Sequence, residues 1–278
     1  MSKPMRAAAF LDKGGVGKTT ATAHLGVALH NNGYDVLMID LAGKQNDLAK
    51  HFGLLEEWEE SEQKPNIAHV FDDSWDYIAE NIDGVVEKLT LATEEGPDLM
   101  PAHKGLDQVD DELASRPVEE RYVIFDQFLS EHVEPQGYDV ILIDLPGLTN
   151  NITLNGLQAA ENIIAPIELG EFEEAQLEAL HEDLEEYNAT LDTKLSVQMI
   201  IPNRVQASTN LDSELLDELA DEYPETVAPN HVPQSQDIRN AQSDGMTAFG
   251  LEEPSSTATR ARDAYEANAA ELVERIHE

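Results

Sequence analysis

A glycine-rich segment close to the start of the chain carries the residue types that bind phosphate. It lies between a short apolar run at residues 6–11 and a segment of helical period, which is the setting that such a loop needs. Glycines let backbone N–H groups close around phosphate oxygens, and the N-terminus of the next helix adds its positive dipole end. We predict that the loop binds ATP, with Lys18 at the β- and γ-phosphates and the Thr19 hydroxyl on Mg²⁺. Its residues are Lys13, Gly14, Gly15, Val16, Gly17, Lys18, Thr19 and Thr20.

Five short apolar runs are spaced along the chain, at residues 6–11, 35–40, 139–144, 162–167 and 196–201. Between them lie segments with apolar residues at helical spacing, such as Leu177, Leu180 and Leu184. Near-continuous apolar strands that alternate with amphipathic helices are typical of a parallel sheet covered on both faces. We therefore predict an α/β fold of the P-loop NTPase type, with a mostly parallel central sheet and helices on both faces. No repeat or linker is visible, so one domain over residues 1–278 is expected, with 54–64 as its most loop-like stretch.

The charge balance is strongly acidic. The 278 residues include 56 Asp and Glu against 17 Lys and Arg, which gives a formal net charge of −39. The acidic residues are spread over the chain, and 41% of all residues are still hydrophobic. At molar salt the Debye length is about 3 Å, so self-repulsion of this size is largely screened. We therefore expect a halophilic protein of a salt-loaded cytoplasm; an ordinary acidic protein is the alternative.

Several common classes of protein are excluded by composition. The sequence has no cysteine, so it forms neither disulfides nor thiolate metal sites. The apolar run at residues 6–11 is too short for a signal peptide, and no apolar stretch approaches the roughly 18 residues of a membrane span. A cytoplasmic location is therefore the expectation.

The lysine directly before the double glycine makes the motif more specific. Lys13 at this position is typical of the deviant Walker A group, and the sequence resembles the ParA/Soj/MinD family of ATPases. The resemblance continues along nearly the whole chain. Residues 34–41 resemble the second strand of the family, and 138–147, which end Asp-Leu-Pro-Gly, resemble its Walker B strand and switch II. Three further segments are similar to ParA in particular, at residues 97–102, 153–157 and 160–167.

The resemblance implies roles for three charged residues around the nucleotide. Lys13 would reach into the site of a second subunit, so that ATP drives formation of a homodimer; a solvated loop charge is the alternative. Asp40 and Asp144 would hold the Mg²⁺ shell through water, because Mg²⁺ keeps several waters in phosphate sites. Either aspartate could instead only cap the end of its strand. The expected catalytic residues are Lys13, Lys18, Asp40 and Asp144.

The resemblance also implies an adenine pocket. Asn203 and Arg204 follow the apolar run at 196–201 and resemble the adenine-contacting pair of the family. An Asn amide can both donate to and accept from the adenine edge, and an Arg plane can stack on the ring. Val232 and Pro233 resemble the loop that closes over the other side of the base. A plain turn after a strand is the alternative for both pairs.

The function implied by the family depends on the branch. ParA members bind DNA non-specifically, whereas MinD members bind membrane through a basic amphipathic helix at the C-terminus. The last residues here, 271–278, are acidic, which argues against a membrane. We expect a slowly hydrolysing ATP switch of the ParA type that partitions plasmid or chromosomal DNA or positions other cargo. It would act with a ParB-like or other partner protein, at the nucleoid when DNA is bound. The alternative is an ATP-dependent protein-interaction or MinD-like positioning switch that does not bind DNA.

Candidate DNA contacts are scarce. Arg239 occupies a position where ParA proteins commonly carry an arginine, and Arg260 and Arg262 open the last helical segment. Each could equally pair with one of the many carboxylates. With about three phosphate contacts, affinity for DNA falls by about four powers of ten between ~0.1 and ~3 M salt. Binding in a salt-loaded cell would therefore need non-ionic contacts or several dimers acting together.

One position departs from the family pattern. Family members usually follow the second strand with Asp-x-Asp, and the second Asp is thought to orient the attacking water. Here that position is Ala42, although Gln45 and Asn46 still match the downstream residues of the family. The resemblance therefore implies tight ATP binding but slow hydrolysis by the protein alone. Alternatively, Asp12, Asp47 or a residue of a partner fills the role.

Overall fold

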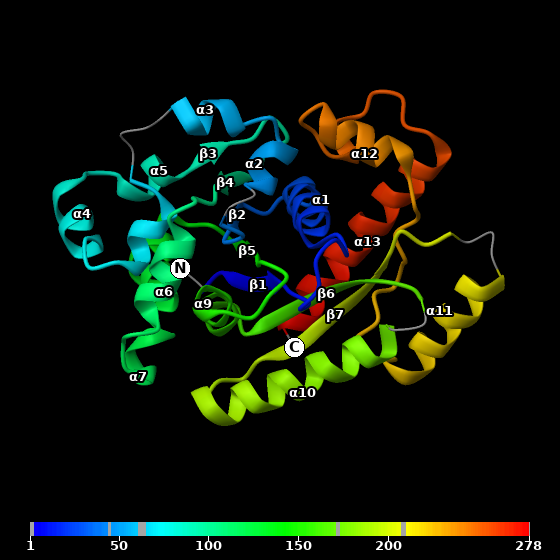
Figure 1. Ribbon diagram of the computed structural model, residues 1–278. Coiled ribbons are helices and arrows are strands. Elements are labelled where there is room, and N and C mark those ends of the chain that lie inside the picture. The colour runs from blue at the N-terminus through cyan, green and yellow to red at the C-terminus, as the bar shows by residue number, and fades with distance from the viewer. Residues whose placement is uncertain (1–2, 44–45, 61–64, 171–172, 207–209, 278) are drawn as a thin grey trace.

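A seven-stranded sheet crosses the centre of the molecule (Figure 1). The structure is a computed structural model that describes residues 3–43, 46–60, 65–170, 173–206 and 210–277. The sheet order is β3-β4-β2-β5-β1-β6-β7, and all neighbouring strands are parallel except β3 and β4. The strands are β1 (Met5–Ala9), β2 (Val36–Asp40), β3 (Leu91–Ala92), β4 (Asp98–Met100), β5 (Val140–Asp144), β6 (Asn162–Glu168) and β7 (Ser196–Asn203).

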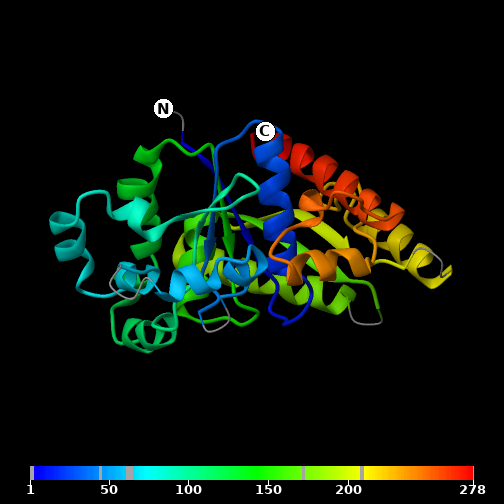
Figure 2. The same ribbon diagram turned by 90° about the horizontal axis from the view of Figure 1, so that it is seen from above.

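Helices cover both faces of this sheet (Figure 2). On one face α1 packs against α13, with α2 and α12 next to them. The opposite face is covered by α6, α8, α9 and α10. The helices of the first face are α1 (Lys18–Asn31), α2 (Asp47–His51), α12 (Gln236–Ser243) and α13 (Ser256–His277). Those of the second are α6 (Leu106–Leu113), α8 (Ile124–Phe128), α9 (Asn151–Ala160) and α10 (Glu173–Leu191).

Further helices and helical turns lie in the remaining connections. The other α-helices are α3 (Leu55–Glu60), α4 (Trp75–Asn81), α5 (Val85–Leu89), α7 (Val118–Arg121) and α11 (Asn210–Glu222). Short 3₁₀ segments cover Ile67–Phe71, Glu134–Gln136 and Ala248–Gly250, and a π-helical turn covers Leu129–Val133. Within the described ranges, no helix combines the length and the apolar character needed to span a bilayer.

The hydrophobic core consists of two clusters, one on each face of the sheet. In β2, Leu37 and Ile39 face one hydrophobic cluster, whereas Val36 and Met38 face the other. Successive side chains of a strand point to opposite faces, so a strand covered on both sides has to be apolar throughout. The near-continuous apolar runs of the sequence follow from this burial, and the predicted α/β fold is confirmed.

Two local predictions need correction. All five predicted strands are present, but the sequence reasoning missed β3 and β4, which have only two and three residues. Residues 54–64 were expected to be loop-like, and this is wrong for their first part, where α3 forms. Its Trp58 is buried, and the indole Nε1 donates to the Ala102 carbonyl at 3.2 Å. Residues 61–64 lie outside the described ranges.

The strand register determines where the polar residues of the sheet meet. Asp40, at the end of β2, is paired in register with Asp144, at the end of β5, and Ala9 of β1 pairs with Asp144 from the other side. The loop between β1 and α1 therefore begins at the same edge as the two aspartates. In parallel sheets ligands bind beyond the carboxyl ends of the strands, so this edge is where a site is expected.

Candidate nucleotide-binding site

Lys18 is held at the mouth of the loop that follows β1. It is the first residue of α1, and only 8% of it is exposed. Its Nζ donates to the carbonyl oxygens of Lys13 at 2.6 Å and Leu11 at 3.0 Å. Burial lowers the pKa of Lys18, while the nearby Asp144 and Asp12 act in the opposite direction. The lysine is thus fixed over the loop, where an ammonium group can bind an anion.

The glycines of the loop are required by its backbone and by its neighbours. Gly15 and Gly17 have φ of 84° and 97°, in the left-handed region that favours glycine. A Cβ on Gly17 would also overlap the side-chain amide of Asn203. From the opposite side, a Cβ on Gly147 would lie 2.7 Å from the Lys13 carbonyl oxygen and 2.9 Å from Lys18 Nζ. The close approach of Gly147 to the lysine is a feature that sequence reasoning did not single out.

Two buried carboxylates lie next to the start of α1. The Thr19 hydroxyl donates to Asp144 Oδ2 at 2.6 Å. Asp40 accepts from the backbone N–H of Ala42 at 2.8 Å and of Leu48 at 3.2 Å. Burial raises the pKa of Asp40 to about 6, and burial together with the neighbouring Asp40 raises the pKa of Asp144. The structure therefore brings Thr19, Asp40 and Asp144 to one edge of the sheet; their role in binding Mg²⁺ stays a prediction.

This donor set fits a divalent cation. Asp144 Oδ1 is buried and has no hydrogen-bond partner among the described residues. Two adjacent buried carboxylates disfavour their own ionisation, and a hard cation with its waters removes that penalty. The hydroxyl of Thr19 and the oxygens of Asp144 are ligands of the kind that Mg²⁺ prefers.

Ala42 occupies the position at which family members usually carry the second aspartate. The Ala42 side chain is half-buried and lines a cavity together with Gly14, Gly147 and Asp107. Asp12, one proposed replacement, is exposed and accepts from the Thr149 hydroxyl at 3.2 Å. Asp47 forms an ion pair of 3.3 Å with Lys50. Gln45 lies outside the described residues.

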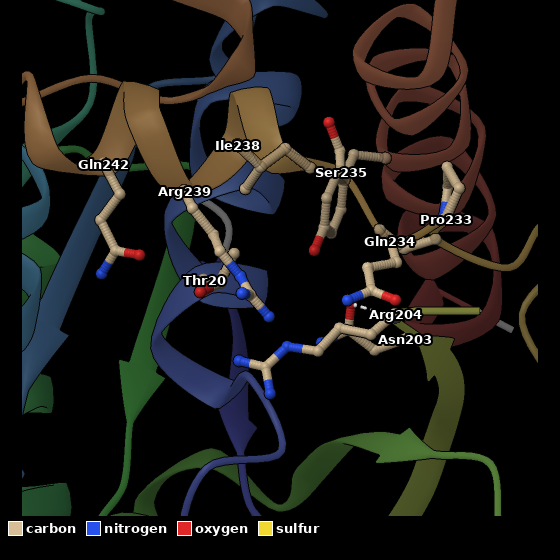
Figure 3. A pocket seen from close by; sticks show the side chains of 11 residues that line it. Thr20, Asn203, Arg204, Pro233, Gln234, Ser235, Ile238, Arg239 and Gln242 are labelled. Carbon is tan, nitrogen blue, oxygen red and sulfur yellow. Dashed lines mark hydrogen bonds between the residues drawn. The ribbon is translucent and has the colours of Figure 1, made fainter. Parts of the chain in front are cut away.

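The predicted adenine residues line one pocket (Figure 3). Thr20 enters it from α1, Asn203 and Arg204 from the end of β7, and Val232 and Pro233 from the loop before α12. Sequence reasoning assigned these five to nucleotide binding; of the rest of the lining it named only Arg239, as a candidate DNA contact. The additional residues are Gln234, Ser235, Ile238, Arg239, Gln242 and Tyr265. Most of them come from α12 and α13, and no local pattern marks them as pocket residues.

Asn203 and Arg204 connect this pocket to the phosphate loop. Asn203 Nδ2 donates to the Val16 carbonyl at 2.9 Å, and its Oδ1 accepts from the Arg204 N–H at 2.9 Å. The Arg204 guanidinium donates to the Gly15 carbonyl at 2.8 Å and forms an ion pair with Glu168. The pair therefore supports the loop in addition to lining the pocket, and contact with adenine stays a prediction.

The three arginines predicted to contact DNA lie in different environments. Arg239 points into the pocket of Figure 3. Arg262 is half-buried, and its guanidinium carbon lies 5.6 Å from the centre of the Phe249 ring. Arg260 is exposed and donates to the hydroxyl of Thr257 at 3.3 Å, within its own helix. Their role in DNA binding stays a prediction.

Comparison with known proteins gives the family. A family profile described as an AAA domain matches residues 6–197, more than half of the chain. The chain is 27% identical to the chromosome-partitioning ATPase Soj of Thermus thermophilus over 277 residues, 100% of this chain and 98% of that protein. It is 30% identical to the cell division protein PomZ of Myxococcus xanthus over 252 residues, 88% of this chain and 71% of that protein. The chain belongs to the ParA/MinD superfamily.

Solved structures agree with this membership at the level of fold. An aspartate-to-alanine variant of McdA from Cyanothece, in complex with ATP, matches with a TM-score of 0.77 and 19% identity over 98% of each chain. Cobyrinic acid a,c-diamide synthase from Mycobacterium smegmatis, with a bound ATP analogue and magnesium, matches with a TM-score of 0.71 and 23% identity. That match covers 98% of this chain and 94% of the synthase. ParA/MinD proteins are P-loop NTPases; binding of the nucleotide by the loop described above stays a prediction.

Proposed function

We propose that this chain is an ATP switch of the ParA/Soj type, which dimerises on ATP and Mg²⁺ and partitions DNA or positions other cargo. The observation that carries the proposal is the arrangement around Lys18, where a glycine loop, a buried ammonium group and two buried aspartates meet at the carboxyl edge of the sheet. Homology to Soj and PomZ supports the partitioning or positioning role. Residues 1–278 would act as a single ATPase domain, in a cytoplasm rich in salt.

Each site residue has a role in this proposal. Lys18 neutralises the β- and γ-phosphates, and Thr19 with Asp40 and Asp144 holds the Mg²⁺ shell. Mg²⁺ supplies charge neutralisation of the phosphates when it is bound. The exposed Lys13 contacts the nucleotide of the second subunit, as its position in the deviant Walker A motif implies. Hydrolysis by the protein alone is slow, because Ala42 supplies no carboxylate.

Nucleotide-dependent dimerisation tests the proposal. Light scattering in molar KCl should find a dimer with ATP and Mg²⁺ and a monomer with ADP. Lys18→Ala should remove ATP binding, whereas Lys13→Ala should stay monomeric and still bind nucleotide. A wild-type protein that is equally monomeric with ATP and with ADP contradicts the dimer.

A switch without DNA is the second candidate, and the surroundings of the arginines favour it. Arg262 is half-buried and packs on Phe249, so it is not presented as a free surface cation. Arg239 is exposed but points into the pocket of Figure 3, which leaves Arg260 as the one of the three that faces solvent away from a ring or pocket. Co-sedimentation with DNA in molar KCl, with ATP, with ADP and without nucleotide, separates the two candidates. ATP-dependent co-sedimentation supports the partitioning ATPase. Its absence, with dimerisation intact, supports a switch whose partner is a protein.

A further inference from the structure

Arg239 is exposed, but its side chain lines the pocket that the predicted adenine residues form. It is in the middle of α12, which begins just after the Val232–Pro233 loop, and its side chain extends toward Thr20 of α1 (Figure 3). Arg204 approaches from the opposite wall, so two guanidinium groups face the same space. Thr20 directly follows Lys18 and Thr19, which lie at the phosphate loop. The space beside Thr20 therefore connects the phosphate loop to the predicted base pocket.

The charge of Arg239 is not neutralised by the protein. No carboxylate of the described residues forms an ion pair with its guanidinium, although the chain has 56 acidic residues and only 17 Lys and Arg. Arg204, on the opposite wall, pairs with Glu168. An arginine that faces a pocket without a carboxylate partner is suited to bind an anion, because its planar fork matches phosphate oxygens.

Two hydroxyl groups of the same pocket also lack partners. Ser235 is 9% exposed and Tyr265 is fully buried, and neither hydroxyl oxygen has a hydrogen-bond partner among the described residues. Burying a hydroxyl without a hydrogen bond is unfavourable, so such groups are normally satisfied. Both line the pocket into which Arg239 points. Neither oxygen is accessible to solvent as the side chains stand, so a polar ligand in this pocket would satisfy them once the side chains turn toward it.

We propose that Arg239 binds the α-phosphate of ATP or ADP, and that Ser235 and Tyr265 hydrogen-bond the nucleoside part. The inference rests on the proposed function, because it assumes that the phosphate loop holds the β- and γ-phosphates. The nucleotide then runs from the loop past Thr20 to the base pocket, and the group that passes Arg239 is the α-phosphate. Arg239 is thus a nucleotide contact and not a DNA contact. Since ATP and ADP share this phosphate, Arg239 contributes equally to the affinity for both.

Calorimetric titration of ATP and ADP, each with Mg²⁺, tests the assignment at low and at molar KCl. The variants are Arg239→Ala, Arg239→Lys and, as the matched control, Arg260→Ala, which removes an exposed arginine outside the pocket. Arg239→Ala should weaken both nucleotides by roughly tenfold or more, as expected for loss of a charged hydrogen bond. Arg239→Lys should recover part of the loss, and Arg260→Ala should bind as wild type does. Ser235→Ala should weaken both nucleotides to a smaller extent.

The outcomes that overturn the assignment are distinct from failure of the proposed function. Affinities of Arg239→Ala within about twofold of wild type for both nucleotides would refute it and return Arg239 to the candidate DNA contacts. Weakening of ATP alone would place the contact at the γ-phosphate and refute the α-phosphate assignment. A wild-type protein that binds neither nucleotide would instead refute the proposed function. Unchanged thermal unfolding of the variants without nucleotide shows that each one is folded.

Discussion

Stability in mild acid should depend strongly on two buried histidines on the face of α1 and α13. His51 of α2 and His24 of α1 are both fully buried, and their rings lie 5.6 Å apart, edge to face. His24 accepts from the Ala248 N–H at 3.1 Å, but neither ring nitrogen of His51 has a partner among the described residues. Burial lowers the pKa of His24 to about 4, and burial with the neighbouring His24 lowers the pKa of His51 to about 3.

The sign and size of the effect follow from these pKa values. The unfolded chain binds a proton at each histidine below pH ~6.5, whereas the folded protein does not until pH is near 4 or 3. Above pH ~6.5 the two histidines therefore do not lower the free energy of unfolding. As pH falls below that value, the free energy of unfolding decreases, down to about pH 4 for His24 and about pH 3 for His51. Between pH 7 and pH 5 the loss is about 2 kcal/mol for each histidine.

His51→Phe isolates one of the two contributions. The ring of Phe has a similar size and leaves no hydrogen bond broken, so the variant should lie within about 1.5 kcal/mol of wild type at pH 7. Between pH 7 and pH 5, the free energy of unfolding of the variant should fall by about 2 kcal/mol less than that of wild type. Urea unfolding at pH 7, 6 and 5 in constant KCl measures this difference. For His277→Gln, at an exposed site, the free energy of unfolding should change with pH in parallel with that of wild type. Parallel curves for His51→Phe and wild type would refute the reasoning.

Two further predictions concern the phosphate site. Ala42→Asp should hydrolyse ATP faster than wild type, by up to about 10² to 10⁴, because it restores a carboxylate that orients water; steady-state turnover without gain would show that another group already fills the role. Gly147→Ala should lower nucleotide affinity roughly tenfold, since its Cβ would lie 2.9 Å from Lys18 Nζ and overpacking costs about 1–3 kcal/mol. Titration with ATP measures this effect, and wild-type affinity would mean that the lysine can move without cost.

The sequence alone determined the phosphate loop and the fold class. The loop from Lys13 to Thr20 is a local feature, because its glycines, its lysine and the helix that follows are contiguous in the chain. The apolar runs likewise report burial on both faces, which holds whatever the order of the strands is. The deviation at Ala42 was also visible, since it is read against residues directly beside it.

Only the tertiary structure decided which distant residues share a site. The register of β2 and β5 brings Asp40 beside Asp144, and the packing of the helices on one face of the sheet brings Thr20, Arg239 and Tyr265 into one pocket. From sequence, Arg239 was a candidate DNA contact because ParA proteins commonly carry an arginine there; an arginine on a polar helix gives no sign of the pocket that its side chain lines. The packing of α3 through its one buried residue, Trp58, was hidden for the same reason. Some of these contacts join residues more than 200 positions apart in a chain of 278, and no local sequence pattern indicates them.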